Sequence, residues 1–293
     1  MLKKILLVGA TGYLGRHLCT YLDKIGSEVF ITGSRISKQP NYFQIDFEDP
    51  KSYNSLKSYK FDLIIVLAAK LSSISSTNLS HPDLAVNTIG YASFLQYLKD
   101  HDITQKVIYI SSMTVYAPVE QPPVCEEDKI GPVSTYGLSK YMGECITTFF
   151  GQSSAVVCVI LRLPGIYGGD KKSGFIYNMI YKLKNNIPIQ LSTKNLIYWE
   201  TIHIDDLCEM IGSFIERYAW KERTNIFNVC YGMETDFYNT FEFIKAQTLS
   251  NKGELYEEKK GYEPFFLSNK KLKGLIPVKE DYYGKLAAYI KSV

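Results

Sequence analysis

The chain has 293 residues, of which 46% are hydrophobic and 22% charged, so it can bury a sizeable core as one large domain or two lobes. Its net charge of +3 is small and its basic residues are dispersed among acids, so nucleic-acid binding is not indicated. No apolar run is long enough to span a membrane, and the six cysteines lack metal-site spacing, which favours free thiols in a reducing cytoplasm.

The first predicted element is an apolar strand, Leu6–Val8, that runs into a glycine-rich turn and then into a helix over Arg16–Ile25. Gly9 and Gly12 let the backbone turn tightly and approach a pyrophosphate, while Gly15 allows close helix packing. A chance strand-to-helix turn is the alternative. The position of this turn at the start of an alternating strand and helix pattern favours a dinucleotide site.

The following elements continue that alternation. We predict strands over Ser27–Thr32, Tyr42–Ile45, Phe61–Leu67, Val107–Ser111 and Ala155–Arg162, with helices at Pro50–Tyr59, Asp83–Asp100 and Ser134–Gly151. Strands that lack period-2 alternation and are separated by helices indicate a parallel sheet covered on both faces. We therefore predict a doubly wound α/β fold, with ligands at the carboxyl ends of the strands.

Candidate catalytic residues fall at one such strand end and on the helix after it. Ser111 and Ser112 end the strand that begins at Val107, and Tyr136 and Lys140 are four residues apart, on one face of a helix. A free tyrosine is a poor acid or base near neutrality, because its pKa is about 10. A lysine ammonium and an oxidised nicotinamide favour its phenolate, so Ser112 is predicted to hold the substrate oxygen while Tyr136 exchanges its proton.

The rest of the chain is predicted to form a second lobe. Helices are expected at Phe175–Lys184, Asp205–Tyr218, Phe237–Gln247 and Tyr282–Ile290, with short strands at Ile187–Leu191 and Ile226–Cys230. We predict a cofactor lobe over residues 1–163 and a substrate lobe over residues 164–293, and the chain is allowed to cross back between them. The four histidines share no spacing that would gather them around a metal, so no metal site is expected.

These motifs, in this order, resemble the extended short-chain dehydrogenase/reductase family, which includes nucleotide-sugar epimerases, dehydratases and 4-ketoreductases. The resemblance covers nearly the whole chain and includes the segments Ser111–Tyr116, Leu161–Gly168 and Ile202–Asp206. It implies an NAD(P)-dependent enzyme with a Rossmann domain and a smaller mixed α/β substrate lobe. It also implies a homodimer formed through a pair of helices, including the one that carries Tyr136.

The resemblance also implies a set of cofactor-binding residues, carried over from the matching motifs. They are Gly9, Thr11, Gly12, Tyr13, Leu14 and Gly15 in the turn, Asp46 and Phe47 near the adenine, Leu67, Ala68 and Ala69 after the fourth strand, the structural Asn87, and Ser111, Tyr136, Lys140 and Pro164.

The end of the second strand bears on the choice of cofactor. An acid there would bind the ribose 2′-hydroxyl of NAD, but Gly33 stands at that position and is followed by Ser34 and Arg35. Those two side chains are suited to a 2′-phosphate, so NADP(H) is favoured and NAD(H) stays possible. The alternative is that Ser34 and Arg35 form an ordinary solvated turn.

The residues after Ser112 narrow the reaction that the resemblance implies. Dehydratases of the family carry an Asp-Glu pair there and bifunctional epimerase-reductases carry a cysteine at the position of Thr114, whereas this chain has Met113 and Thr114. Redox at one carbinol or ketone carbon remains, and a 4-ketoreductase is favoured. A C4 epimerase with tightly bound NAD and a non-catalytic NADP-binding regulatory protein stay as alternatives.

A nucleotide sugar is the expected substrate, with Ser112, Thr114 and Trp199 as candidate contacts. Two positions depart from the pattern of the family's nucleotide-sugar enzymes: Gly165 replaces a common asparagine, and the stretch around Trp199 lacks a common arginine that grips the diphosphate. Trp199 is suited either to stacking on a base or sugar or to packing. Lys171, Lys172 and Lys194 are candidate phosphate contacts, with ordinary solvated lysines as the alternative.

Overall fold

The computed structural model describes residues 3–71, 76–79, 82–118, 122–192, 199–249, 253–256 and 265–293. By its backbone contacts the chain divides into two compact units. Unit 1 comprises Met1–Ala117, Lys129–Arg162 and Phe214–Phe227, and unit 2 comprises Pro118–Asp128, Leu163–Ser213 and Asn228–Val293. The chain therefore passes repeatedly from one unit to the other. The division into a cofactor lobe over 1–163 and a substrate lobe over 164–293 stays a prediction.

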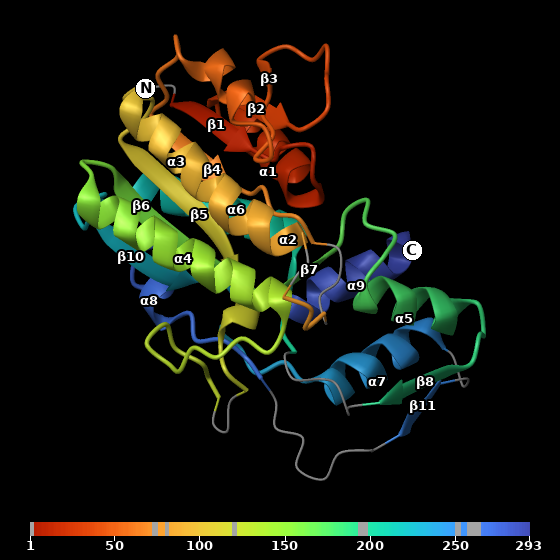
Figure 1. The fold of residues 1–293 in the computed structure, drawn as a ribbon. Coiled ribbons are helices and arrows are strands. Elements are labelled where there is room, and N and C mark those ends of the chain that lie inside the picture. Colours follow the sequence, from red (N-terminus) through yellow and green to blue (C-terminus); the bar gives the residue numbers. More distant parts are fainter. Residues whose placement is uncertain are drawn as a thin grey trace. The chain divides into compact units, whose positions relative to one another are not determined.

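Unit 1 is built on a seven-stranded sheet in the order β10-β6-β5-β4-β1-β2-β3 (Figure 1). Its strands are β1 (Lys4–Val8), β2 (Glu28–Gly33), β3 (Tyr42–Gln44), β4 (Leu63–Val66), β5 (Lys106–Ser112), β6 (Val157–Leu163) and β10 (Thr224–Asn228). The neighbours from β3 through β2, β1 and β4 to β5 are parallel. The predicted doubly wound α/β fold is confirmed.

The strand sequences lack alternation because the sheet is covered on both faces. Consecutive residues of β1 and β4, such as Leu6, Leu7, Ile64 and Ile65, are all completely buried. After β3 the chain returns to the other side of β1 to form β4, so the strand order switches direction between β1 and β4. The carboxyl ends of strands at such a switch point are where this fold binds ligands.

The helices of unit 1 follow the predicted positions, with two differences in type. They are α1 (Tyr13–Lys24), α2 (Pro82–Ala85), α3 (Tyr91–Asp100) and α4 (Thr135–Ser153). The segment Pro50–Leu56 is a 3-10 helix capped by Asp49, and a π-helical turn, Val86–Gly90, joins α2 to α3. Helices α3 and α4 lie side by side (Figure 1) and pack on each other. Ser134 caps α4, since its hydroxyl accepts a hydrogen bond from the Gly137 N–H at 3.1 Å.

One predicted strand is in the wrong place. We expected Ile226–Cys230 to belong to the second lobe, but the strand observed, β10 (Thr224–Asn228), lies beside β6 at the edge of the seven-stranded sheet. The sequence pattern indicates a strand but does not indicate which strand it pairs with. Here β10 pairs with β6 and covers the outer side of that apolar strand.

Unit 2 contains the remaining helices and two small parallel strand pairs. The helices are α5 (Phe175–Lys184), α6 (Ile204–Arg217), whose last turn counts with unit 1, α7 (Phe237–Thr248), α8 (Lys270–Lys273) and α9 (Tyr282–Ser292). β7 (Gly165–Tyr167) pairs with β9 (Thr201–His203), and β8 (Ile189–Ser192) pairs with β11 (Gly253–Tyr256). The four predicted helices are confirmed, whereas β7, β9 and β11 were not predicted.

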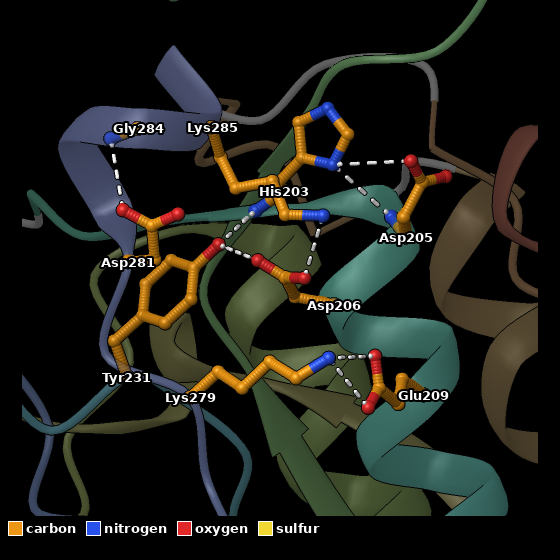
Figure 2. A network of polar contacts seen from close by, with 9 residues as sticks. All are labelled: His203, Asp205, Asp206, Glu209, Tyr231, Lys279, Asp281, Gly284 and Lys285. Atoms are coloured by element: carbon orange, nitrogen blue, oxygen red, sulfur yellow. Dashed lines mark hydrogen bonds and ion pairs between the residues drawn. The ribbon is translucent and has the colours of Figure 1, made fainter. Parts of the chain in front are cut away.

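A buried polar network holds unit 2 together around the start of α6 (Figure 2). The Asp206 carboxylate accepts a hydrogen bond from the Tyr231 hydroxyl at 2.7 Å and pairs with the Lys285 ammonium at 2.9 Å. The Tyr231 oxygen in turn accepts the backbone N–H of His203 at 3.2 Å. The network joins α6, α9 and the segment after β10. None of the helices in the described ranges is long and apolar enough to cross a membrane.

Candidate active site

A cavity of about 450 Å³ opens at the carboxyl ends of β1 to β4, within unit 1. The predicted cofactor residues that line it are Gly9, Thr11, Gly12, Ser34, Asp46, Phe47, Leu67, Ala68 and Ala69. The structure thus brings together four segments that are far apart in the sequence, at the place where the strand order switches direction.

The glycine-rich turn after β1 is packed too tightly for side chains. Gly9 has a φ of +88°, and a Cβ there would lie 2.7 Å from the Cα of Ala68. A Cβ on Gly15 would lie 2.5 Å from the Cα of Ala10, so Gly15 serves helix packing as predicted and does not line the cavity. Tyr13 and Leu14 form the first turn of α1 and are likewise outside the lining.

The end of β2 carries no acidic side chain, and a side chain at Gly33 would need its neighbours to move. A Cβ on Gly33 would lie 2.8 Å from the Thr11 side chain and 2.9 Å from the Tyr42 hydroxyl. Ser34 lines the cavity, whereas Arg35 is exposed on the following loop and is outside the lining. The structure therefore brings Ser34 to the cavity and leaves the proposed phosphate contact of Arg35 untested.

Three polar residues of the lining escaped the sequence analysis: Thr32, Glu48 and Lys70. The Lys70 ammonium lies 3.4 Å from the Glu48 carboxylate. Each follows a recognised motif directly, Glu48 after Asp46-Phe47 and Lys70 after Leu67-Ala68-Ala69, which is the signal that could have revealed them. Thr32 accepts a hydrogen bond from the Gly9 N–H at 3.1 Å.

Asn87 joins the cavity to the helix that carries the candidate catalytic residues. Its side chain accepts the Lys70 N–H at 2.7 Å and donates to the Lys70 carbonyl at 3.0 Å. It also donates to the Ser139 hydroxyl on α4 at 3.0 Å. Asn87 is buried and lies outside the lining, and its hydrogen bonds join the segment after β4 to α4.

Helix α4 carries Tyr136 and Lys140 on one face, in environments that oppose their charged forms. The Tyr136 side chain keeps some exposure to solvent, but its burial is sufficient to raise its pKa to about 12. Lys140 is only 2% exposed, its ammonium lies 4.2 Å from the centre of the Tyr109 ring, and burial lowers its pKa to about 7. The negative charge of Glu144 counteracts part of that lowering.

Ser112 ends β5 and begins a 3-10 turn, Met113–Val115. The Ser112 hydroxyl oxygen accepts hydrogen bonds from the Thr114 N–H at 3.2 Å and from the Thr114 hydroxyl at 3.0 Å. The turn also packs against α4, because a Cβ on Gly137 would lie 2.3 Å from the Thr114 carbonyl oxygen. Ser112 and Thr114 are therefore direct neighbours, and their contact with a substrate stays a prediction.

Glu144 is a further buried residue at this site that the sequence analysis did not single out. Its carboxylate forms a two-pronged ion pair with Arg162, with N to O distances of 2.9 and 2.7 Å, and accepts the Ser111 hydroxyl at 2.5 Å. The carboxylate beside it raises the pKa of Arg162 despite burial. The signal in the sequence is the spacing Tyr136, Lys140, Glu144, which repeats every four residues.

The remaining candidates lie in unit 2. Pro164 is buried between β6 and β7. Trp199 is 4% exposed, and its ring centre lies 5.2 Å from that of Phe175 and 5.3 Å from that of Phe237, so the described contacts are packing contacts. The Lys171 ammonium donates to the Ile166 carbonyl at 2.9 Å, and Lys172 is exposed. Lys194 lies outside the described residues.

Comparison with known proteins shows similarity along most of the chain. The model of the NAD dependent epimerase/dehydratase family matches residues 5–230. A Methanocaldococcus jannaschii protein that carries the name of a UDP-glucose 4-epimerase is 27% identical over 267 residues, 87% of this chain and 85% of the relative. The Escherichia coli dTDP-4-dehydro-6-deoxyglucose reductase is 23% identical over 261 residues, 82% and 80% of the two chains.

The fold is also shared with solved structures. The UDP-glucose 4-epimerase of Thermotoga maritima, crystallised with UDP-glucose, superposes with a TM-score of 0.81 at 21% identity, over 98% of this chain and 97% of that chain.

Proposed function

We propose that this chain, which belongs to the NAD dependent epimerase/dehydratase family of NAD(P)-dependent sugar epimerases and reductases, transfers hydride at one carbinol or ketone carbon of a nucleotide sugar. The observation that carries the proposal lies within unit 1, which contains both the glycine-walled cavity and the Ser112, Tyr136 and Lys140 side chains. The names of the relatives support a nucleotide sugar as the substrate class.

The cavity fits a nicotinamide dinucleotide. Its wall at Gly9 and Gly12 is bare backbone at the end of β1, which suits a diphosphate, and Asp46 and Phe47 line it on the side assigned to the adenine. Ser34, with Arg35 after it, is the candidate contact for a 2′-phosphate. When bound, the cofactor supplies or accepts the hydride.

The side chains of unit 1 supply the acid, the base and the contact to the substrate oxygen. In the direction of reduction, the Tyr136 hydroxyl gives its proton to the oxygen that becomes the alcohol, and the Ser112 hydroxyl holds that oxygen. The phenolate left behind needs a nearby positive charge, because burial holds the pKa of Tyr136 at about 12. Lys140 supplies this charge, so the reaction requires Lys140 to be protonated.

A 4-ketoreductase that uses NADPH is the favoured activity. With Gly33 at the end of β2, the chain lacks the acid that usually contacts the ribose of NAD, and Met113 and Thr114 replace the residues that dehydratases carry. The reductase among the relatives agrees with this reading. The alternative is a C4 epimerase with tightly held NAD, which the relatives named as UDP-glucose 4-epimerases favour.

A side-by-side titration of the cofactor-free protein with NADPH and NADH tests the proposal, together with analysis of any cofactor that co-purifies. Exchangeable NADPH that binds more tightly than NADH, and that is weakened by Arg35→Ala, supports the reductase. Bound NAD that resists exchange supports the epimerase. Binding of neither nucleotide contradicts both.

A product assay then separates the two reactions. The reductase consumes NADPH in step with a nucleoside-diphosphate 4-keto sugar, whereas the epimerase converts UDP-glucose to UDP-galactose with no net consumption of cofactor. Cofactor binding without turnover in either assay, across a panel of nucleotide sugars, favours the non-catalytic alternative.

The proposed assembly is a homodimer that covers the outer face of α3 and α4. Three apolar side chains are exposed here: Ile89 by 71% on the π-helical turn before α3, and Met142 by 38% and Phe149 by 71% on α4. A second copy of the chain would bury them. Phe149→Lys should convert the dimer to a monomer in light scattering, and a wild-type monomer contradicts the proposal. The six free cysteines agree with a reducing cytoplasm as its location.

A further inference from the structure

Glu144 continues the row of candidate catalytic residues on α4. It lies four residues after Lys140 and eight after Tyr136, which places all three side chains along one face of the helix. Its side chain is 3% exposed. A carboxylate is seldom buried to this degree unless it is paired, so its contacts indicate its purpose.

Those contacts join the elements that present the candidate catalytic residues. One carboxylate oxygen of Glu144 accepts the Ser111 hydroxyl of β5 at 2.5 Å and the Arg162 Nε of β6 at 2.9 Å, and the other accepts Arg162 Nη2 at 2.7 Å. Ser111 precedes Ser112 in the chain. Glu144 thereby holds the strand end that presents Ser112 against the helix that presents Tyr136 and Lys140.

Stability alone does not explain this arrangement. A buried ion pair adds little over apolar side chains of the same size, because both ions lose their hydration. The planar guanidinium of Arg162 meets the carboxylate at two points and its centre lies 4.7 Å from the centre of the Tyr116 ring, so the carboxylate has one orientation. The arrangement places an ion pair of fixed orientation inside unit 1, and its carboxylate lies on the face of α4 that carries Lys140.

Lys140 is the group that this charge acts upon. Its ammonium is buried and faces the Tyr109 ring, which is a weak partner compared with water or a carboxylate. The other buried titratable groups on the elements packed around α4 are Tyr109 on β5, Tyr91 on α3, Asp83 on α2, and Cys158 and Arg162 on β6. Burial raises the pKa of both tyrosines and of the Cys158 thiol, so these groups stay neutral and leave Glu144 and Asp83 as the buried acids.

We propose that Glu144 is a positioning residue for the proposed hydride-transfer reaction: it fixes the end of β5 against α4 and supplies the buried negative charge that keeps Lys140 an ammonium. The inference rests on the proposed function for its kinetic consequence. Its electrostatic part concerns the cofactor-free protein and is testable without any substrate.

The direct test is a pH titration of Lys140 by NMR in the cofactor-free protein labelled with ¹³Cε-lysine, with the signal assigned by its loss in Lys140→Arg. Glu144→Gln keeps the shape and an acceptor oxygen but removes the charge. Because the ammonium then loses its stabilising partner, we expect the midpoint of the Lys140 titration to fall by about 1–3 pH units. An unmoved midpoint overturns the inference.

Two matched variants control for the loss of a buried charge. Asp83→Asn removes the other buried acid on the elements packed around α4, and Asp206→Asn removes a similarly buried, cation-paired carboxylate in unit 2. Both should leave the midpoint of Lys140 within about half a pH unit of wild type. A shift in Asp83→Asn without one in Glu144→Gln assigns the charge to Asp83 and overturns the inference.

The kinetic test separates charge from simple damage to the fold. Reduction needs Lys140 charged, so the rate falls as the pH rises through its pKa, and in Glu144→Gln this fall should begin at a pH lower by the same amount. Activity should recover at low pH. A loss of kcat that is equal at every pH indicates a purely structural role and overturns the inference. If wild type itself has no turnover, the proposed function fails while the NMR titration still decides the role of Glu144.

Discussion

Each unit of this protein contains a buried carboxylate paired with a cation, and the two pairs are built differently. In unit 1 the side chains of Glu144 and Arg162 are both 3% exposed and meet at two points. In unit 2 the side chain of Asp206 is 2% exposed, but that of its partner Lys285 is 31% exposed (Figure 2). An arginine fork fixes the orientation of its partner, whereas a lysine ammonium is a point charge on a flexible stem.

The two pairs also differ in the residues that they contact. Glu144 also binds Ser111, next to Ser112, and lies one turn from Lys140. Asp206 also binds Tyr231 and, through it, the backbone of His203, so it joins α6 and α9. The same pairing of charges thus orients acid-base groups in one unit and tethers helices in the other. Changes in unit 1 should therefore affect catalysis, and changes in unit 2 should affect stability.

The largest expected effect is on catalysis in unit 1. Tyr136→Phe should lower kcat by about 10²–10⁴-fold, because it removes the proposed proton donor, while the unfolding midpoint stays unchanged. Steady-state kinetics and chemical denaturation check the two halves of this statement. Tyr141→Phe, on the same helix, is the control and should keep its activity. Full turnover by Tyr136→Phe with the cognate substrate would rule out the proposed mechanism.

A third buried carboxyl extends the comparison, because its described partner is a backbone N–H and not a cation. Glu200 of unit 2 accepts the Leu267 N–H at 2.6 Å, and burial raises its pKa to about 8. The unfolded chain loses this proton near pH 4.5, whereas the folded chain keeps it until about pH 8. Across that window the ionisation of Glu200 therefore favours the unfolded state increasingly as the pH rises.

Glu200→Gln cannot ionise and keeps an acceptor for Leu267. Its free energy of unfolding should exceed that of wild type by a margin that grows by about 1.4 kcal/mol per pH unit from pH 5 to pH 8. Urea denaturation at four pH values measures the margin. A margin that stays constant or shrinks contradicts the assignment.

Breaking the pair in unit 2 should cost stability alone. Asp206→Ala should lower the free energy of unfolding by about 3 kcal/mol, the lower end for a broken buried pair, because the partly exposed Lys285 retains access to water. Activity per folded molecule should be unchanged. Glu209→Ala removes the exposed pair with Lys279 in the same region and should cost less than about 1 kcal/mol. A loss of kcat in folded Asp206→Ala would break the comparison.

The smallest effects come from the neutral hydroxyl that donates to each carboxylate. Ser111→Ala and Tyr231→Phe each remove one such hydrogen bond and should each lower the free energy of unfolding by about 1.5 kcal/mol, the lower end for a hydrogen bond to a charged group. Only Ser111→Ala should also lower kcat, by several-fold. Equal effects of the two variants on kcat would argue against a division of roles between the two networks.

The fold of unit 1 was predictable because its strands and its turn are local signals. The apolar runs of β1 and β4 mark a buried parallel sheet, and Gly9 and Gly12 mark the turn between β1 and α1. Strand pairing is not local. The sequence around Ile226 indicates a strand, but only the open side of β6 decides that this strand joins the large sheet.

The candidate site was predictable in part for the same reason. Asp46 and Ala68, which lie inside contiguous motifs, line the cavity, whereas Gly15 lies inside a motif without lining it and Arg35, at the end of its motif, is exposed. The pairing of Glu144 with Arg162 joins a helix to a strand, and the sequence around either residue does not indicate the other as its partner. A repeat of polar residues at every fourth position of one helix was the available clue.

The edge position of β10 limits how this protein can be divided. A fragment that ends at residue 163 contains every strand of the sheet except Thr224–Asn228, so the side of β6 that β10 occupies has no strand beside it. Exposed, apolar strand edges are templates for association between chains. Such a fragment should aggregate, whereas a circularly rearranged gene that keeps 224–228 with the rest of unit 1 should not. The ribosome must likewise synthesise the chain through residue 228 before the outer edge of β6 can be covered.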